Sequence, residues 1–330
     1  MRRPRNLPLW MLLAGAGLLV VTVVVAVVVL PRRKAAAPTA SRPTTTAAVP
    51  PATTTTTTTA APATTTSPPP STTAPPAPSP VPMSWQSAGG LVWHADSIDP
   101  EVLAEAMRQA GFGWVAVQLA DGSTATPLPE GWIARFRAAS GLPVGGWSVL
   151  RDDPVGEARL AASLVQQDGL DFYVADAELE YAYTNGTDKS SARYARSARF
   201  VAAFRAAEPT LPAGLSSYCR PDVNDLDWAA WARAGFQFLP QAYVGDFGAA
   251  GDPAVCVRAA SAFFPADRVH PTLGVHPGQF GTPSPGEYGA LLAQAHTSGF
   301  SLYPAENVGD RWQGFGDVIR ALPVARAVAP

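Results

Sequence analysis

Three carboxylates alternate with other residues in the segment Phe172-Tyr-Val-Ala-Asp176-Ala-Glu178-Leu-Glu180. Because strand side chains point to alternate faces, all three share one face if this apolar strand stays extended. Charges crowded beside apolar surroundings repel one another, which predicts a raised pKa for at least one carboxyl group. Such a group can protonate a glycosidic oxygen, while a second carboxylate stabilises positive charge, acts as nucleophile or orients a substrate acetamide. We therefore predict Glu178 and Asp176 as a catalytic pair. The alternative is a solvated acidic loop.

These residues need a scaffold, and from Leu91 onward the chain repeats a short apolar strand, a polar or glycine turn and a helix. The predicted strands are Leu91–His94, Trp114–Leu119, Val144–Val149, Phe172–Ala175, Ala213–Ser217, Phe236–Gln241, Thr272–Val275 and Ser301–Pro304. The predicted helices are Pro100–Ala110, Trp132–Ser140, Val155–Gln167, Ser190–Ala207, Leu226–Ala234, Pro253–Phe264, Pro285–Ser298 and Asp317–Leu322. Eight such units predict an α/β fold, the (β/α)8 or TIM barrel. An open doubly wound sheet is the alternative, weakened by the absence of a Gly-rich phosphate loop after the first strand.

In a (β/α)8 barrel, functional residues lie at the C-terminal ends of the strands, and polar and aromatic residues gather there in this sequence. Sugars offer hydroxyl groups to polar side chains and flat C–H faces to aromatic rings. We predict these substrate-binding residues: Asp96, His94, Gln118, Trp147, Tyr218, Gln241, Tyr243, Asp246 and Glu306. The alternatives are a packed, hydrogen-bonded role for His94, a helix-capping role for Asp96 and core packing for each tryptophan.

Other chemistries find less support in the sequence. Its four histidines are scattered without a metal-binding spacing, and no Gly-x-Ser-x-Gly or Cys-x-x-Cys motif occurs, so we predict neither a metal nor another cofactor. The two cysteines, Cys219 and Cys256, could pair in an oxidising compartment; two buried thiols are the alternative.

The N-terminal quarter of the chain has a different composition. Residues 1–6 form a short basic tail, and 7–30 carry no charge and are long enough for a transmembrane helix. Residues 31–82 are dominated by Ala, Pro, Ser and Thr, which predicts a disordered stalk ahead of the barrel at 83–330. We expect a single-pass membrane protein with its N-terminus inside and its barrel outside the cytoplasm. Secretion after signal cleavage is the alternative.

Charge limits the partners of the barrel. All 26 acidic residues follow Ala95, and 17 of the 24 basic residues follow Arg42, which leaves the C-terminal part with a formal net charge of about −9. Nucleic-acid binding needs a basic face and is not expected. We expect a monomeric barrel with a polysaccharide or peptidoglycan-type substrate.

Short motifs at the strand ends resemble the family-25 glycoside hydrolases, the lysozyme-like muramidases. They are Asp176-Ala-Glu178 together with Asp96, Gly214-Leu-Ser-Ser-Tyr218 and Pro240-Gln-Ala-Tyr243. The resemblance implies that Glu178 is the catalytic acid, that Asp176 assists it and that Asp96 lies in the substrate groove. Chitinase-like family-18 barrels also share an Asp-x-Glu on the fourth strand. The resulting hypothesis is an exported glycosidase, and a non-catalytic carbohydrate-binding barrel is the alternative.

Overall fold

The computed structural model describes residues 81–178, 191–221, 226–297 and 299–322. The chain divides into two units, Met1–Pro70 and Ser71–Pro330, and every described residue belongs to the second unit. The predicted tail, membrane span and nearly all of the predicted stalk lie outside the described residues, as does Glu180. Among the helices that are described, none combines the length and apolar character required to cross a bilayer.

Eight parallel strands close into a barrel, because β1 pairs with β2 on one side and with β9 on the other. A strand of only two residues, β3, follows β2 and pairs with it in antiparallel orientation. The strands are β1 (Gly89–Val92), β2 (Trp114–Asp121), β3 (Thr124–Ala125), β4 (Val144–Val149), β5 (Tyr173–Asp176), β6 (Ala213–Tyr218), β7 (Gln237–Ala242), β8 (Thr272–Gly274) and β9 (Ser301–Tyr303). The predicted barrel is therefore confirmed, and the open doubly wound sheet is excluded.

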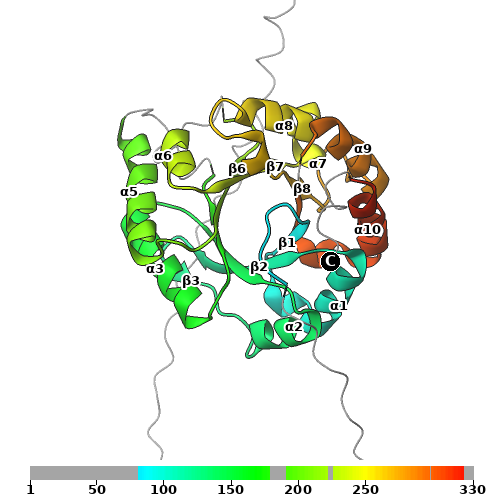
Figure 1. Cartoon of the computed structure of the whole chain (residues 1–330), viewed down its shortest axis with the longest axis horizontal. Coiled ribbons are helices and arrows are strands. Elements are labelled where there is room, and N and C mark those ends of the chain that lie inside the picture. Colours follow the sequence, from blue (N-terminus) through cyan, green and yellow to red (C-terminus); the bar gives the residue numbers. More distant parts are fainter. Residues whose placement is uncertain (1–80, 179–190, 222–225, 298, 323–330) are drawn as a thin grey trace, which may run out of the picture. The chain divides into compact units, whose positions relative to one another are not determined.

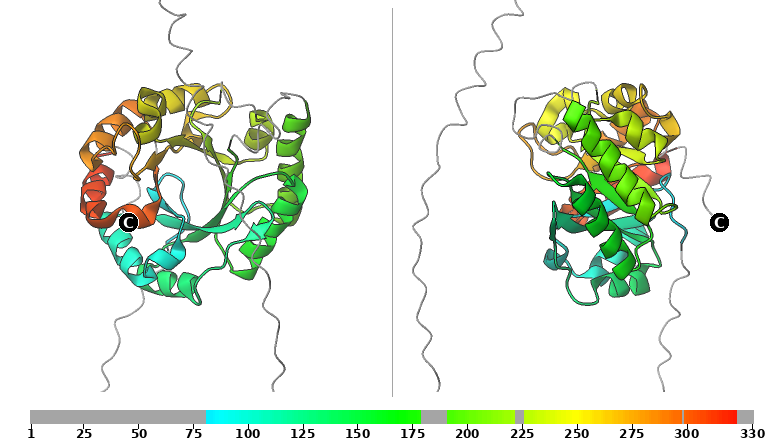
Figure 2. Two further views of the ribbon diagram at one scale, coloured as in Figure 1. Left: turned by 180° about the vertical axis from the view of Figure 1, so that it is seen from behind. Right: turned by 90° about the vertical axis from the view of Figure 1, so that its left-hand side faces the viewer.

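Helices surround the ring of strands, as Figure 1 shows in a view along the barrel. They are α1 (Pro100–Ala110), α2 (Trp132–Ser140), α3 (Pro154–Gln167), α5 (Ser191–Ala207), α6 (Trp228–Arg233), α7 (Val244–Phe247), α8 (Pro253–Ala260), α9 (Pro285–Ala295) and α10 (Trp312–Ala321). The same ring is visible from behind in Figure 2. Helix α10 begins five residues before its predicted start, and the short helix α7 was not predicted.

Local capping explains why many helix boundaries could be predicted. Asp99 accepts hydrogen bonds from the first turn of α1, where Pro100 occupies the first helical position. Gly111 ends the same helix in the left-handed conformation, with φ of 83°. At the start of α9, Ser284 and Glu287 form a reciprocal capping box. These signals are local in sequence, so they can be recognised without knowing the fold.

The alternation of β5 divides the apolar core into an inner and an outer part. Phe172 and Val174 belong to the cluster inside the barrel, whereas Tyr173 belongs to the larger cluster between strands and helices. The Tyr173 ring stacks on Phe204 of α5, with centroids 4.8 Å apart. Asp176 continues the inward-facing series of Phe172 and Val174 towards the C-terminal end of the barrel.

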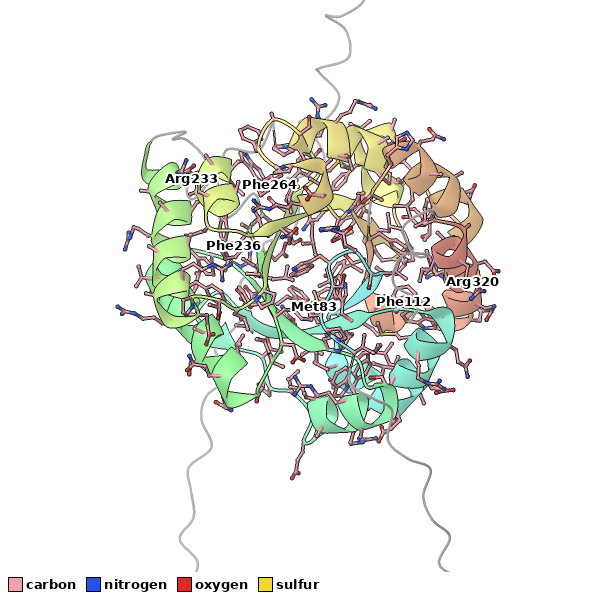
Figure 3. The ribbon with its side chains drawn as sticks, in the orientation of Figure 1. Met83, Phe112, Arg233, Phe236, Phe264 and Arg320 are labelled. Atoms are coloured by element: carbon pink, nitrogen blue, oxygen red, sulfur yellow. A yellow bond between two sulfur atoms is a disulfide. The ribbon has the colours of Figure 1, made fainter. Side chains whose placement is uncertain are left out.

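The N-terminal end of the barrel is closed by the segment that precedes β1. The Trp85 ring lies 5.6 Å from that of Trp114 and 5.4 Å from that of Phe172, both in edge-on packing. Met83 packs against the same inner cluster, and Figure 3 shows it within the ring of strands. The polypeptide therefore enters the barrel domain from the end opposite to the C-terminal ends of the strands.

Candidate active site

A pocket opens at the C-terminal ends of the strands. Its lining residues come from β1, β4, β5, β6, β9 and the turn after β7, and they are Leu91, Trp147, Val174, Asp176, Glu178, Ser216, Tyr243 and Tyr303. Leu91 and Val174 belong to the inner apolar cluster, on which the pocket rests. The pocket thus brings together carboxylates, hydroxyl groups and aromatic rings from six parts of the chain.

Gln241, near the end of β7, connects the two carboxylates. Its side-chain amide donates to Asp176 Oδ1 at 3.1 Å and to Glu178 Oε1 at 2.8 Å. The same nitrogen lies 3.4 Å from Ser216 Oγ. One amide group therefore holds both predicted catalytic carboxylates at the pocket, which the strand alternation alone would not do, because Glu178 follows the end of β5.

Burial distinguishes the two carboxylates. Asp176 is 8% exposed, whereas Glu178 is half-buried. Burial raises the pKa of Asp176 well above its usual range, and the adjacent charge of Glu178 raises it further. Hydrogen bonds from Ser216 and Gln241 and the positive charge of Arg151 oppose this rise only in part. With this raised pKa, the Asp176 carboxyl group stays protonated to a higher pH than an ordinary aspartic acid does.

Aromatic rings form one side of the pocket. The rings of Tyr243 and Tyr303 stack with centroids 5.8 Å apart, and the ring of Trp147 meets Tyr303 edge-on at 5.9 Å. Trp147 Nε1 donates to the Val92 carbonyl at 2.8 Å, which holds the indole against β1. Burial raises the pKa of both tyrosines, so their hydroxyl groups stay protonated and can donate hydrogen bonds.

Other predicted site residues lie outside the pocket lining. Glu306 accepts hydrogen bonds from the backbone amides of Trp93 and His94, and the exposed His94 ring stacks on Trp93. Asp96 is exposed and lines a shallow groove beside Pro129, Trp132 and Arg135.

The remaining predicted residues lie in β2, β6 and α7. Gln118 is buried in β2. Asp246 Oδ2 lies 2.6 Å from Nε2 of His276, whose ring packs edge-on against Tyr243. Tyr218, at the end of β6, has its ring 5.1 Å from that of Phe247 in α7.

The structure adds Tyr303 and Ser216 to the residues predicted for the site. Ser216 is opposite Asp176 in the β5–β6 register, so a pairing of the two predicted strands could have found it. Tyr303 is the last residue of β9, and its position at a strand end is the corresponding signal. Among the described residues, no group of three or more His, Cys, Asp or Glu side chains could hold a metal ion.

A disulfide joins Cys219 to Cys256, with 4.9 Å between the two Cα atoms. Cys219 directly follows β6, and Cys256 lies in α8. The structure therefore contains the disulfide rather than two buried thiols. The bond ties the loop beyond Tyr218 to the outer helices at the pocket end of the barrel.

Comparison with known proteins finds solved glycosidase barrels whose fold is similar to that of this chain. A GH18 chitinase from Pseudoalteromonas aurantia aligns with a TM-score of 0.51 at 11% identity, over 70% of this chain and 99% of that one. A class V chitinase from Nicotiana tobaccum, a Glu-to-Gln mutant in complex with NAG4, has a TM-score of 0.51 at 10% identity, with 70% and 98% covered. An endo-beta-N-acetylglucosaminidase from Cordyceps militaris, with an aspartate and a glutamate two positions apart both replaced, has a TM-score of 0.50 at 11% identity, with 73% and 92% covered.

No family model and no curated protein matches the sequence of this chain. At these identities the structural likeness establishes the fold alone, which is the (β/α)8 fold of the GH18 chitinases. The family-25 resemblance finds no support among these neighbours.

Proposed function

We propose that this protein is a glycoside hydrolase that cleaves O-glycosidic bonds of a polysaccharide by carboxylate acid/base catalysis. The observation that carries the proposal is the pair of carboxylates, Asp176 and Glu178, which Gln241 holds together at the end of β5. Asp176 is buried with a raised pKa and Glu178 is accessible to a substrate, so the pair can hold a proton next to a carboxylate that reaches the glycosidic oxygen.

In the proposed reaction, Glu178 gives its proton to the glycosidic oxygen as the bond from that oxygen to the anomeric carbon breaks. The leaving sugar departs with this proton, and water then adds its hydroxyl group to the anomeric carbon and returns its other proton to the Glu178 carboxylate. The raised pKa of Asp176 favours retention of a proton beside Glu178, and the pair can pass this proton to the substrate through Glu178. Tyr243 and Tyr303 then offer hydroxyl donors and ring faces to the sugar in the pocket.

The proposed substrate is a polysaccharide of N-acetylated sugars, such as chitin or the glycan of peptidoglycan. Once its proton has passed to Glu178, the Asp176 carboxylate can accept a hydrogen bond from the N–H group of a substrate acetamide, so Asp176 is suited to orienting that group. The names of the neighbouring structures, chitinase and endo-beta-N-acetylglucosaminidase, agree with that class of substrate.

The proposed location is the outer surface of a membrane, with the barrel anchored through residues 7–30 and separated from the bilayer by residues 31–82. A disulfide forms and persists mainly in oxidising compartments, so the Cys219–Cys256 bond supports this location. The mass of the mature protein distinguishes an intact anchor from cleavage and secretion.

The test uses the full-length chain in detergent with peptidoglycan, chitin oligomers and a panel of other polysaccharides. Reducing-end release is compared among the wild type, Glu178→Gln and Asp176→Asn. The matched control is Glu208→Gln, which alters a carboxylate after the C-terminal end of α5. Release by the wild type and the control that disappears in Glu178→Gln would support the proposal. Binding without release by any of the proteins would favour a non-catalytic carbohydrate-binding barrel.

A further inference from the structure

We infer that Trp93 and His94 form a binding site for a second sugar ring beyond the pocket, and that Glu306 is the residue that positions it. The inference rests on the proposed function, because it concerns the path of a polysaccharide across the same end of the barrel. It also gives Glu306 a role different from direct contact with sugar hydroxyl groups.

The exposure of Trp93 is the first observation. Among the described tryptophans, Trp93 alone is exposed, with 44% of its surface accessible. It follows Leu91 by two residues, just beyond the end of β1, and its ring lies 6.3 Å from that of Tyr303. Leu91 and Tyr303 both line the pocket. Trp93 therefore lies beside the pocket and towards solvent.

A ring partner fixes the orientation of this indole. The His94 ring stacks on Trp93 with centroids 4.3 Å apart and planes inclined by 26°. Stacking covers one face of the indole, while 44% of the Trp93 surface stays accessible to a sugar whose C–H face packs on an aromatic ring. An indole that served only the core would be buried, as Trp114 and Trp132 are.

Glu306 holds the backbone that carries this pair. Strand β1 ends at Val92, so the next two backbone amides have no neighbouring strand to pair with. The Glu306 carboxylate accepts both: Trp93 N lies 3.1 Å from Oε2, and His94 N lies 2.9 Å from Oε1. The carbonyl of His94 in turn accepts from the Ser97 hydroxyl at 2.7 Å. The turn is thus fixed through its amides and its carbonyl.

Aromatic rings connect the proposed subsite to the pocket. The Trp93 ring lies 6.3 Å from that of Tyr303, which in turn stacks on Tyr243 at 5.8 Å. Tyr243 and Tyr303 both line the pocket beside Asp176 and Glu178. A row of rings therefore runs from the carboxylates to the rim, and a linear oligosaccharide fits it better than a single sugar does.

The test compares N-acetylglucosamine oligomers from the dimer to the hexamer, with binding measured by calorimetry and cleavage by reducing-end release. The full-length wild type, Trp93→Ala, Trp93→Tyr and Phe263→Ala are used, the last removing another exposed aromatic side chain beyond the end of α8. We expect Trp93→Ala to weaken hexamer binding and raise KM by up to about tenfold, with dimer binding and kcat unchanged. Trp93→Tyr should restore most of the loss, and Phe263→Ala should match the wild type.

Glu306 is tested by its coupling to Trp93. If Glu306 acts through the turn, Glu306→Ala should reproduce the loss seen in Trp93→Ala, and the double variant should lose no more. Glu306→Gln keeps an acceptor oxygen for the two amides and should retain most of the affinity. Additive losses in the double variant would show direct sugar contact by Glu306 and would overturn its positioning role.

Two further outcomes separate this inference from the proposed function. If the wild type binds or cleaves the oligomers but Trp93→Ala has the same dependence on oligomer length, the subsite is refuted and the proposed function stands. If the wild type neither binds nor cleaves any oligomer, both are refuted for this class of substrate.

Discussion

The two ends of the barrel have opposite characters, although the same strands build both. At the N-terminal end, Trp85 closes the interior against Trp114 and Phe172. At the C-terminal end, Asp176 and Glu178 face a pocket with hydroxyl groups and aromatic rings. The segment that includes β5 shows the change most directly. Its inward-facing side chains are Phe172, Val174 and then the buried carboxyl group of Asp176.

This difference indicates that the proposed chemistry is confined to the open end, whereas the closed end contributes apolar packing. Apolar packing at the closed end removes a large surface from water without requiring hydrogen-bond partners. At the open end, the Asp176 carboxyl group is buried despite its cost, and Gln241 and Ser216 supply the hydrogen bonds that reduce it. Substitutions of Glu178 at the open end and of Trp85 at the closed end should therefore separate activity from stability.

The largest expected effect is the loss of activity in Glu178→Gln. Removing a general acid should lower kcat by about 10²–10⁴-fold, while the free energy of unfolding should change by no more than about 0.5 kcal/mol. Reducing-end release and urea unfolding on the same preparation measure both. A variant that unfolds much more easily than wild type would contradict the separation of the two ends.

The next largest expected effect is the loss of stability on removal of the disulfide, which lies at the open end. Its cysteines are 37 residues apart, and closing a loop of that length stabilises the native state by about 3–4 kcal/mol in the chain-entropy description. We expect Cys219→Ser with Cys256→Ser to lower the urea midpoint accordingly, and reduction of the wild type to have the same effect. Equal midpoints for the oxidised wild type and the double variant would show that packing alone holds this end.

The closed end is tested by Trp85→Ala. Trp85 is half-buried, so the expected loss is near the lower end of the range for such truncations, about 3 kcal/mol. Activity per folded molecule should be retained, because Trp85 does not line the pocket. Trp93→Ala is the matched control for stability, since this exposed indole should contribute little to unfolding. Similar urea midpoints for the two variants would refute a stabilising role for Trp85 at the closed end.

The sequence predicts the closed barrel better than the open end, for physical reasons. Strand Val144–Val149 and helix α1 have their predicted bounds because alternation and capping are encoded by neighbouring residues. The crowding of three carboxylates at this strand end also predicted a raised pKa for at least one of them, and Asp176 has one.

Contacts between distant residues set the remaining features of the site. Gln241 joins carboxylates more than sixty positions away, and Glu306 completes the end of β1 from more than two hundred positions away. No local pattern records such pairings. The sequence could therefore identify these residues as polar groups at strand ends, but not the partners that define their roles.

The pH dependence of stability sharpens the contrast further. The unfolded chain releases the Asp176 proton above a pH of about 3.9, whereas the native state keeps it until the raised pKa is passed. The native state therefore binds more protons in that interval, and its stability falls as pH rises through it. Asp176→Asn removes this titration and should be less pH-dependent. From about pH 4 to pH 7, the free energy of unfolding of Asp176→Asn should rise relative to that of the wild type. The rise should be about 1.4 kcal/mol for each unit by which the native pKa of Asp176 is raised within that interval.

Urea unfolding of the wild type and Asp176→Asn between about pH 4 and pH 8 measures the difference. Glu157, whose burial also raises its pKa, is present in both proteins, so its contribution cancels. Parallel stability curves would mean that Asp176 ionises in the native state as it does in the unfolded chain. In that case burial of the Asp176 carboxylate would not destabilise the native state. Glu178 would then have to take its proton from solvent in each turnover.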